Sequence, residues 1–190
     1  VQTCALPILR AKLAPGTRCA LEHGGVAPVI VAQDADLETA LSSVAKGGFY
    51  HAGQVCVSVQ RVYVHQSIAR EFALKLGEIA GALVVGDPAD AATEVGPLIR
   101  GKETDRVSEW VTEAIGEGAE LICGGAKISS ALYQPTVLYN PAQTSKVSQK
   151  EVFGPVVCVY SFDKIEEALQ RANSLDVAFQ GAVYTQDIDT

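Results

Sequence analysis

The fold class is decided by residues 26–65, which read VAPVIVAQDADLETALSSVAKGGFYHAGQVCVSVQRVYVH. Near the start of this stretch, Val29-Ile30-Val31 is a continuous β-branched run, typical of a strand that is covered on both faces. Asp34 or Asp36 can cap a following helix, because a short acidic side chain accepts hydrogen bonds from the first free N–H groups. Apolar residues recur at helical spacing in that segment: Leu37, Ala40, Leu41, Val44 and Ala45. A second β-rich run extends from Val59 to His65, so that strand, helix and strand alternate.

The rest of the chain continues this alternation. Further helices are predicted over residues 9–18, from an N-cap at Ser67, around Trp110, and over residues 165–172. Further strands are predicted over residues 19–21, 119–123, 135–139, 156–162 and 181–185. The alternation predicts an α/β fold with a mainly parallel sheet flanked by helices. No internal repeat or linker interrupts it, so residues 9–190 are predicted to form one domain.

Residues 1–8, VQTCALPI, differ in character from the rest of the chain. They match the translation of a nucleotide string that is used in sequencing-library adapters. A genuine buried strand with an early proline is the alternative interpretation. We favour a non-native segment and leave residues 1–8 out of the fold argument. On that interpretation Cys4 has no function.

Charge and cysteine content exclude several classes of protein. The net charge is −7 and Lys and Arg form no cluster, which disfavours nucleic acid and anionic membrane surfaces as partners. The longest apolar runs are far too short to span a bilayer. The five cysteines form no CxxC pair and the histidines are not paired, so neither a disulfide framework nor a metal site is predicted. A reducing compartment, the cytoplasm, fits best.

Cys56 is the first candidate for chemistry, because it ends the turn Gly-Gln-Val-Cys between a helix and a strand. A thiol near backbone N–H groups could be stabilised as a thiolate and attack a carbonyl carbon. The alternative is a small core residue, the commoner fate of a free cysteine. Glu22, just before Gly24-Gly25, could act as a general base or could be a solvated surface charge.

A second group of candidates is weaker by itself. Glu151 could accept hydrogen bonds from sugar hydroxyls, and Phe153 could pack on a flat ring, although both also fit an ordinary strand entry. His51 and His65 flank Cys56, which raises a cysteine-hydrolase interpretation that nothing else supports. No GxGxxG motif or P-loop is present to cradle a phosphate.

Taken together, these motifs resemble the aldehyde dehydrogenase superfamily. The segment EHGGVAP, residues 22–28, resembles its Glu-Leu-Gly-Gly-x-x-Pro signature, and GQVC, residues 53–56, resembles its cysteine signature. Further matches follow in order at residues 61–64, 85–88, 96–99, 135–138, 151–156 and 172–173. The resemblance extends from about Arg10 to Asp189, and it departs from the family pattern at His23, where an aliphatic residue is usual. An imidazole there could tune Glu22 near neutral pH.

The resemblance implies a role for each matching residue. Cys56 would form a thiohemiacetal with a small-molecule aldehyde, and Glu22 would activate the water that hydrolyses the later thioester. Glu151 would bind the nicotinamide ribose of NAD or NADP, Phe153 would lie beside the nicotinamide ring, and Gly24 would also lie at the cofactor. The backbone N–H of Cys56 would supply one oxyanion donor, and an asparagine from a segment before this chain would supply the other.

The resemblance also implies what lies outside the chain. Residues 9–190 would be an internal fragment of the catalytic domain, truncated at both ends and lacking the nucleotide-binding region. The intact protein would be a homo-oligomer that converts an aldehyde to a carboxylic acid without acylating CoA. Two alternatives stay open: a CoA-acylating aldehyde dehydrogenase, and a truncated fragment with no activity of its own.

Overall fold

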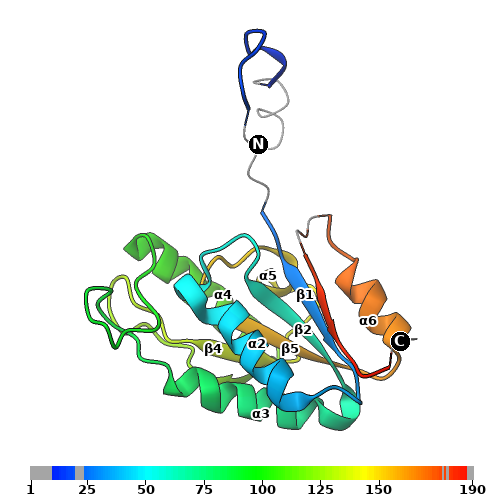
Figure 1. Ribbon diagram of the computed structural model, residues 1–190. Helices are drawn as coiled ribbons and strands as arrows, with labels where there is room; N and C mark the ends of the chain where they lie inside the picture. The colour runs from blue at the N-terminus through cyan, green and yellow to red at the C-terminus, as the bar shows by residue number, and fades with distance from the viewer. Residues whose placement is uncertain (1–9, 20–23, 177, 179, 188–190) are drawn as a thin grey trace.

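The computed structural model describes residues 10–19, 24–176, 178 and 180–187. Its sheet follows the order β3-β4-β5-β2-β1-β6 (Figure 1). The strands are β1 (Ala27–Val31), β2 (Val59–His65), β3 (Glu120–Cys123), β4 (Thr136–Tyr139), β5 (Val156–Phe162) and β6 (Ala182–Tyr184). All neighbouring pairs are parallel except β3 with β4, which confirms the predicted mainly parallel α/β sheet.

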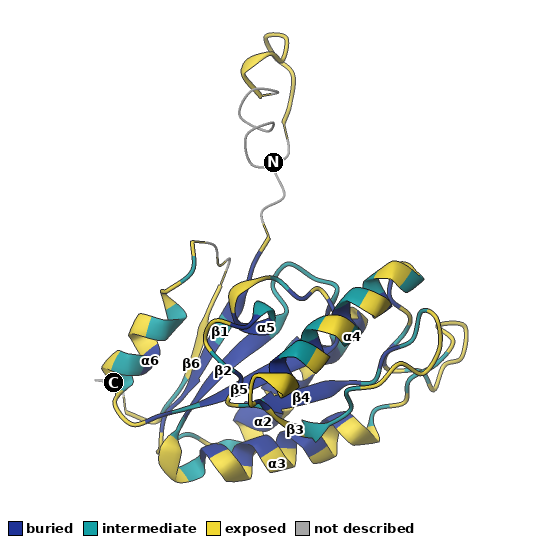
Figure 2. Ribbon diagram, turned by 180° about the vertical axis from the view of Figure 1, so that it is seen from behind, coloured by how far each residue is buried: buried dark blue, intermediate teal, exposed yellow. Residues whose placement is uncertain are grey.

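Helices cover both faces of this sheet (Figures 1 and 2). One face carries α2 (Leu37–Phe49) and α3 (Gln66–Ala82), and the other carries α4 (Gly101–Gly116), α5 (Lys146–Gln149) and α6 (Ile165–Ala172). A sheet with both faces covered must be apolar on both, which explains the unbroken β-branched runs in the sequence. No helix of the described residues is long and apolar enough to cross a membrane.

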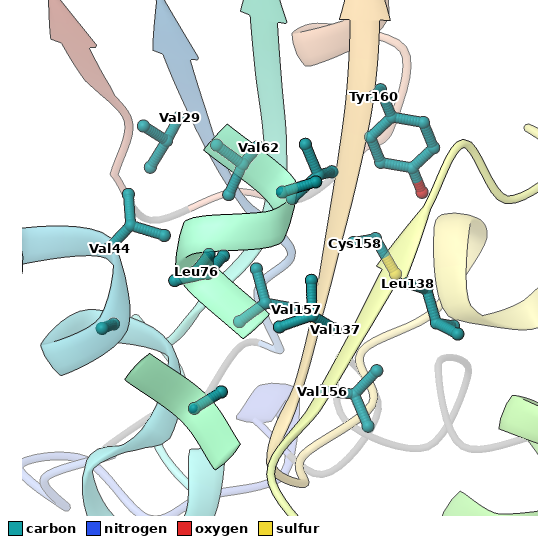
Figure 3. Close-up of a cluster of buried hydrophobic side chains, with 14 of the residues drawn as sticks. Val29, Val44, Val62, Leu76, Val137, Leu138, Val156, Val157, Cys158 and Tyr160 are labelled. Atoms are coloured by element: carbon teal, nitrogen blue, oxygen red, sulfur yellow. The ribbon is translucent and has the colours of Figure 1, made fainter. Parts of the chain in front are cut away.

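The core lies between the sheet and these two helix layers. Figure 3 shows Val62, Val137 and Val157 on the side of β5 that faces Leu76, with Cys158 and Tyr160 on its other side. Burial raises the pKa of the Cys158 thiol to about 12, so this cysteine is an inert core residue. The commoner fate of a free cysteine therefore applies to Cys158.

The structure shows which residues cap the first two long helices, α2 and α3. The Asp36 carboxylate accepts hydrogen bonds from the N–H groups of Glu38 and Thr39, so Asp36 caps α2. The prediction of Ser67 as the cap of α3 is wrong. His65 is the cap, because its Nδ1 accepts a hydrogen bond from the Ser67 N–H at 3.3 Å. A histidine nitrogen in its acceptor form replaces the usual hydroxyl here.

The amino-terminal part also differs from the prediction. Residues 12–19 form turns and bends and are exposed, so the helix expected over residues 9–18 does not continue through them. With Pro15 and Gly16 in its second half, this segment has no run of helix formers to sustain one. Residues 1–8, Glu22 and His23 lie outside the described residues. The short α5 was not predicted, because a single turn is too brief to show a helical period.

Candidate active site

The candidate residues lie on three segments that each lead into a strand. Gly24-Gly25 precede β1, the turn that carries Cys56 precedes β2, and Glu151 to Gly154 precede β5. Because β5, β2 and β1 are parallel neighbours, their amino ends meet at one edge of the sheet. Open parallel sheets usually bind ligands at the carboxyl ends of their strands, so this site lies at the opposite edge.

The turn before Cys56 has an unusual backbone. His51, Ala52 and Gly53 are consecutive residues in the left-handed region, with φ of 50°, 54° and 68°. Glycine adopts this conformation freely, whereas each of the other two costs about 1–2 kcal/mol. Such strain persists where the surroundings hold the chain in place, and it clusters at functional sites. Ala52 is fully packed, which is one such constraint.

Gln54 supplies a second constraint on the turn. Its Oε1 accepts a hydrogen bond from the Ile99 N–H at 2.9 Å, and its Nε2 donates to the Pro97 carbonyl at 3.1 Å. The same Nε2 also donates to the His51 carbonyl at 3.2 Å. The side-chain amide thus joins the cysteine turn to the loop of residues 96–99. This accounts for a glutamine in the Gly-Gln-Val-Cys motif.

Cys56 follows this anchored turn and is only half-buried. Within the part of the chain that the structure describes, its backbone N–H donates no hydrogen bond, so that group is free for a ligand. A hollow of about 770 Å³ borders the two residues before it, Gln54 and Val55, and it is also lined by His51, Ile99 and Phe153. Cys56 does not itself line this hollow, but it is half-buried where Cys158 is sealed, and a nucleophile needs access.

Glu151 and the glycine pair are brought together. The Gly25 N–H donates a hydrogen bond of 2.9 Å to Glu151 Oε1. A side chain on Gly24 would place its Cβ 3.0 Å from Glu151 Oε2, so the carboxylate lies directly against a residue without a side chain. This contact holds Glu151 against Gly24-Gly25, whereas Glu22 lies outside the described residues.

Phe153 joins the cysteine turn to the Glu151 segment. Its φ is 48°, and its side chain is 41% exposed on the wall of the 770 Å³ hollow. Next to it, the Gly154 carbonyl oxygen lies so close to Gly53 that an added Cβ would stand only 2.1 Å away. The structure thus brings the turn that precedes Cys56 against the Glu151–Phe153 segment, and Glu151 against the glycine pair.

The two histidines do not form a cysteine-hydrolase pair. His51 lies in the strained turn and lines the hollow, but His65 ends β2 at the carboxyl edge of the sheet, away from Cys56. Its ring caps α3 and packs edge-on against Phe162. Among the described residues, no group of three or more His, Cys, Asp or Glu side chains is arranged to hold a metal ion.

Arg61 belongs to one of the matching motifs, residues 61–64, but no role was predicted for its side chain. It is 2% exposed, and its guanidinium donates to the carbonyl of Val26 and to the carbonyls of Arg171 and Ala172 that end α6. The negative end of a helix dipole stabilises a buried cation there. Arg61 thereby ties the strand that follows the glycine pair to α6. A charged residue inside an otherwise apolar strand was the available signal.

The aldehyde dehydrogenase family model matches residues 6–190, nearly the whole chain. The chain belongs to the aldehyde dehydrogenase family. A curated relative, the 3-sulfolactaldehyde dehydrogenase of Priestia aryabhattai, is 46% identical over 171 residues, which are 90% of this chain and 36% of the relative. The chain thus spans about a third of the length of the curated relatives that it matches.

Solved structures of aldehyde dehydrogenases share the fold. A glyceraldehyde-3-phosphate dehydrogenase of Methanocaldococcus jannaschii, complexed with NADP, has a TM-score of 0.88 and 38% identity over 97% of this chain and 40% of that chain. A betaine aldehyde dehydrogenase of Staphylococcus aureus, in complex with NAD+, has a TM-score of 0.87 and 35% identity over 98% of this chain and 38% of that one. Aldehyde dehydrogenases similar to this chain therefore bind either nucleotide.

Proposed function

We propose that this protein oxidises a small aldehyde to the carboxylic acid with NAD+ or NADP+ and that Cys56 is the nucleophile. The observation that carries the proposal is the contact between Gly53 and Gly154, which joins the cysteine turn to the Glu151–Phe153 segment. Family membership makes aldehyde oxidation the reaction class. The names of the relatives include sulfonated and cationic aldehydes, so the proposal extends to the reaction and not to one substrate.

The proposed chemistry begins at the Cys56 sulfur. The thiolate attacks the aldehyde carbon, and the oxyanion that forms accepts a hydrogen bond from the free Cys56 N–H. NAD(P)+, when bound, accepts the hydride that leaves this carbon, and a thioester remains on Cys56. Glu22 takes a proton from a water molecule that attacks the thioester, which releases the acid and regenerates the thiol. Glu151 and Phe153 are proposed to hold the nicotinamide ribose and ring, with Gly24 leaving room for them.

The fit of the cofactor rests on the described residues. The Glu151 carboxylate has one oxygen bonded to the Gly25 N–H and keeps further acceptor capacity for ribose hydroxyls. Phe153 presents a half-exposed aromatic surface to the hollow beside Val55. A sugar and a flat ring are the two chemical groups that these side chains can recognise.

The test of the proposed function is a product assay on the full-length protein encoded by the gene. With a panel of aldehydes, we expect formation of NADH or NADPH, measured by absorbance at the reduced-nicotinamide band, and one carboxylic acid per nucleotide reduced. Product that forms only as acyl-CoA, and only when CoA is added, would instead support the acylating alternative. We further propose that the 190-residue chain alone reduces no nucleotide, and its reduction of NAD+ or NADP+ would contradict this.

Replacing Glu22 by glutamine is expected to separate the two half-reactions. The thioester should still form, because the nucleophile is intact, but its hydrolysis should slow by roughly two to four orders of magnitude without the general base. Rapid mixing should then show a burst of one reduced nucleotide per site followed by slow turnover. Equal loss of the burst and the steady state would contradict the assignment of Glu22 to the hydrolytic step.

The proposal also concerns the cellular compartment and the oligomeric state of the enzyme. A nucleophilic thiol must stay reduced, so a reducing compartment such as the cytoplasm suits it. Assembly into a homo-oligomer stays a prediction from the family resemblance.

A further inference from the structure

Gln60 sits at an irregularity of β2, four residues after the candidate nucleophile. In the pairing of β1 with β2, Ala27 is opposite Val59 and Pro28 is opposite Arg61, which leaves Gln60 as an extra residue. An extra residue in one strand is a β-bulge, and bulges next to active sites turn a side chain in a direction that regular pairing would not allow. Gln60 is nevertheless buried, so its polar side chain needs partners inside the protein.

The partners of Gln60 all belong to the segment around Glu151. Its Nε2 donates to the carbonyls of Val147 and Lys150, each at 2.8 Å, and its Oε1 accepts from the Val152 N–H at 2.9 Å. Both amide hydrogens and one oxygen lone pair are thus used. The three contacts lie on both sides of Glu151, at sequence separations of about ninety residues.

Lys150 is the last residue that α5 holds, through its N–H to the Lys146 carbonyl, and Glu151 and Val152 belong to no strand or helix. The carbonyl of Lys150 and the N–H of Val152 bind Gln60, and the carbonyl of Val152 accepts from Arg106 Nη2 at 2.6 Å. Two side chains therefore take the place of a sheet ladder in a stretch of irregular backbone. The hydrogen bonds at Lys150 and Val152 thus fix the backbone on both sides of Glu151 and directly before Phe153, whose φ is 48°.

We propose that Gln60 is a positioning residue for the cofactor. Its three hydrogen bonds, one to the backbone of α5 and one to the backbone on each side of Glu151, set the positions of Glu151 and Phe153. The inference rests on the proposed function of Glu151 and Phe153. Because the bulge lies on the strand that follows Cys56, the same strand start locates both the nucleophile and the proposed nicotinamide contacts. Among the residues that the structure describes, the side chain of Gln60 bonds only to the Glu151 segment and α5, so replacing it should weaken cofactor use while leaving the aldehyde site in place.

The test compares Gln60→Met and Gln60→Glu in the full-length protein. Methionine fills a similar volume without any of the three hydrogen bonds, whereas glutamate keeps the acceptor but sets a carboxylate against two carbonyl oxygens. We expect kcat/KM for the nucleotide to fall roughly ten- to a hundredfold, as for a misplacement of about 1 Å, while the KM for aldehyde changes by less than about twofold. Repulsion between the new carboxylate and these carbonyl oxygens should make Gln60→Glu the more damaging variant.

Two further measurements separate positioning from general destabilisation. Hydrogen exchange of the Val152 amide, followed by mass spectrometry of peptides over residues 148–156, should be faster in Gln60→Met. Val64→Ala is the matched control, because it creates a cavity at the far end of the same strand. It should lower thermal stability but leave both the nucleotide KM and the exchange at Val152 unchanged.

The outcomes distinguish the two proposals. Unchanged exchange at Val152, or an unchanged nucleotide KM in both Gln60 variants of an active protein, would overturn the positioning role alone. An equal rise of the nucleotide KM in Val64→Ala would overturn it as well. A wild-type protein that reduces neither nucleotide with any aldehyde would overturn the proposed function, and the cofactor role of Gln60 with it.

Discussion

Replacement of Cys56 by alanine is expected to lower kcat/KM for aldehyde oxidation by at least about three orders of magnitude, because no covalent intermediate can form. The turn should keep its shape, since its left-handed residues and the Gln54 hydrogen bonds do not involve the sulfur. The variant should therefore bind nucleotide with an affinity close to that of the wild type. Reduced-nicotinamide formation and a nucleotide-binding titration measure the two effects separately.

Cys123→Ala is the matched control for this experiment. Cys123 is also a free, half-buried cysteine, but it lies in β3, away from the site. Burial raises the pKa of its thiol, and its Sγ contacts the Pro135 carbonyl. Its removal should leave the rate within about twofold, because it plays no part in the chemistry. Full activity in Cys56→Ala, or an equal loss in Cys123→Ala, would rule out Cys56 as the nucleophile.

Replacement of Gly53 by alanine is expected to reduce the free energy of unfolding by about 2–5 kcal/mol. At φ of 68° an alanine is strained by about 1–2 kcal/mol. Its Cβ would also stand 2.1 Å from the Gly154 carbonyl oxygen, and relieving such an overlap by moving backbone costs a further amount of about 1–3 kcal/mol. Urea unfolding of the full-length protein measures the effect.

Activity should fall with stability in Gly53→Ala, because the overlap pushes the cysteine turn away from the Phe153 segment. Gly118→Ala is its control. Gly118 also has a positive φ, of 103°, but an added Cβ there would meet nothing within 4 Å. It should show only the backbone cost, about 1–2 kcal/mol, and normal turnover per folded molecule. Equal destabilisation by the two substitutions would contradict the close packing of Gly53 on Gly154.

Much of the fold could be predicted because its signals are local. The β-branched run at Val29 and the helical spacing from Leu37 to Ala45 each lie within a few residues, and β1 and α2 match them. The predictions failed where the sequence pattern was too short to show a helical period or was shared by two candidate cap residues. One turn of α5 shows no period, and the choice of His65 over Ser67 as a cap depends on which nitrogen lone pair faces the helix.

For the candidate site too, residues in short motifs could be predicted and residues with distant partners could not. Cys56, Glu151 and Phe153 could be proposed from the sequence because their motifs are short and ordered along the chain. The family match over residues 6–190 confirms the family that those motifs resemble. The roles of Gln60 and Arg61 were not predicted, because the sequence around them does not show which groups their side chains bind. Their partners Val147 and Ala172 lie 87 and 111 residues further along the chain.

The sequence by itself determined the strand and helix periods, the turn glycines and the candidates for the reactive side chains, since each depends on a few neighbouring residues. Only the tertiary structure decided that the amino ends of β5, β2 and β1 lie together, that the Gln60 side chain bonds to the backbone around Glu151, and that Gly53 meets Gly154. The physical reason is that strand order and register come from packing and hydrogen bonding between distant segments, whose strength no local pattern records.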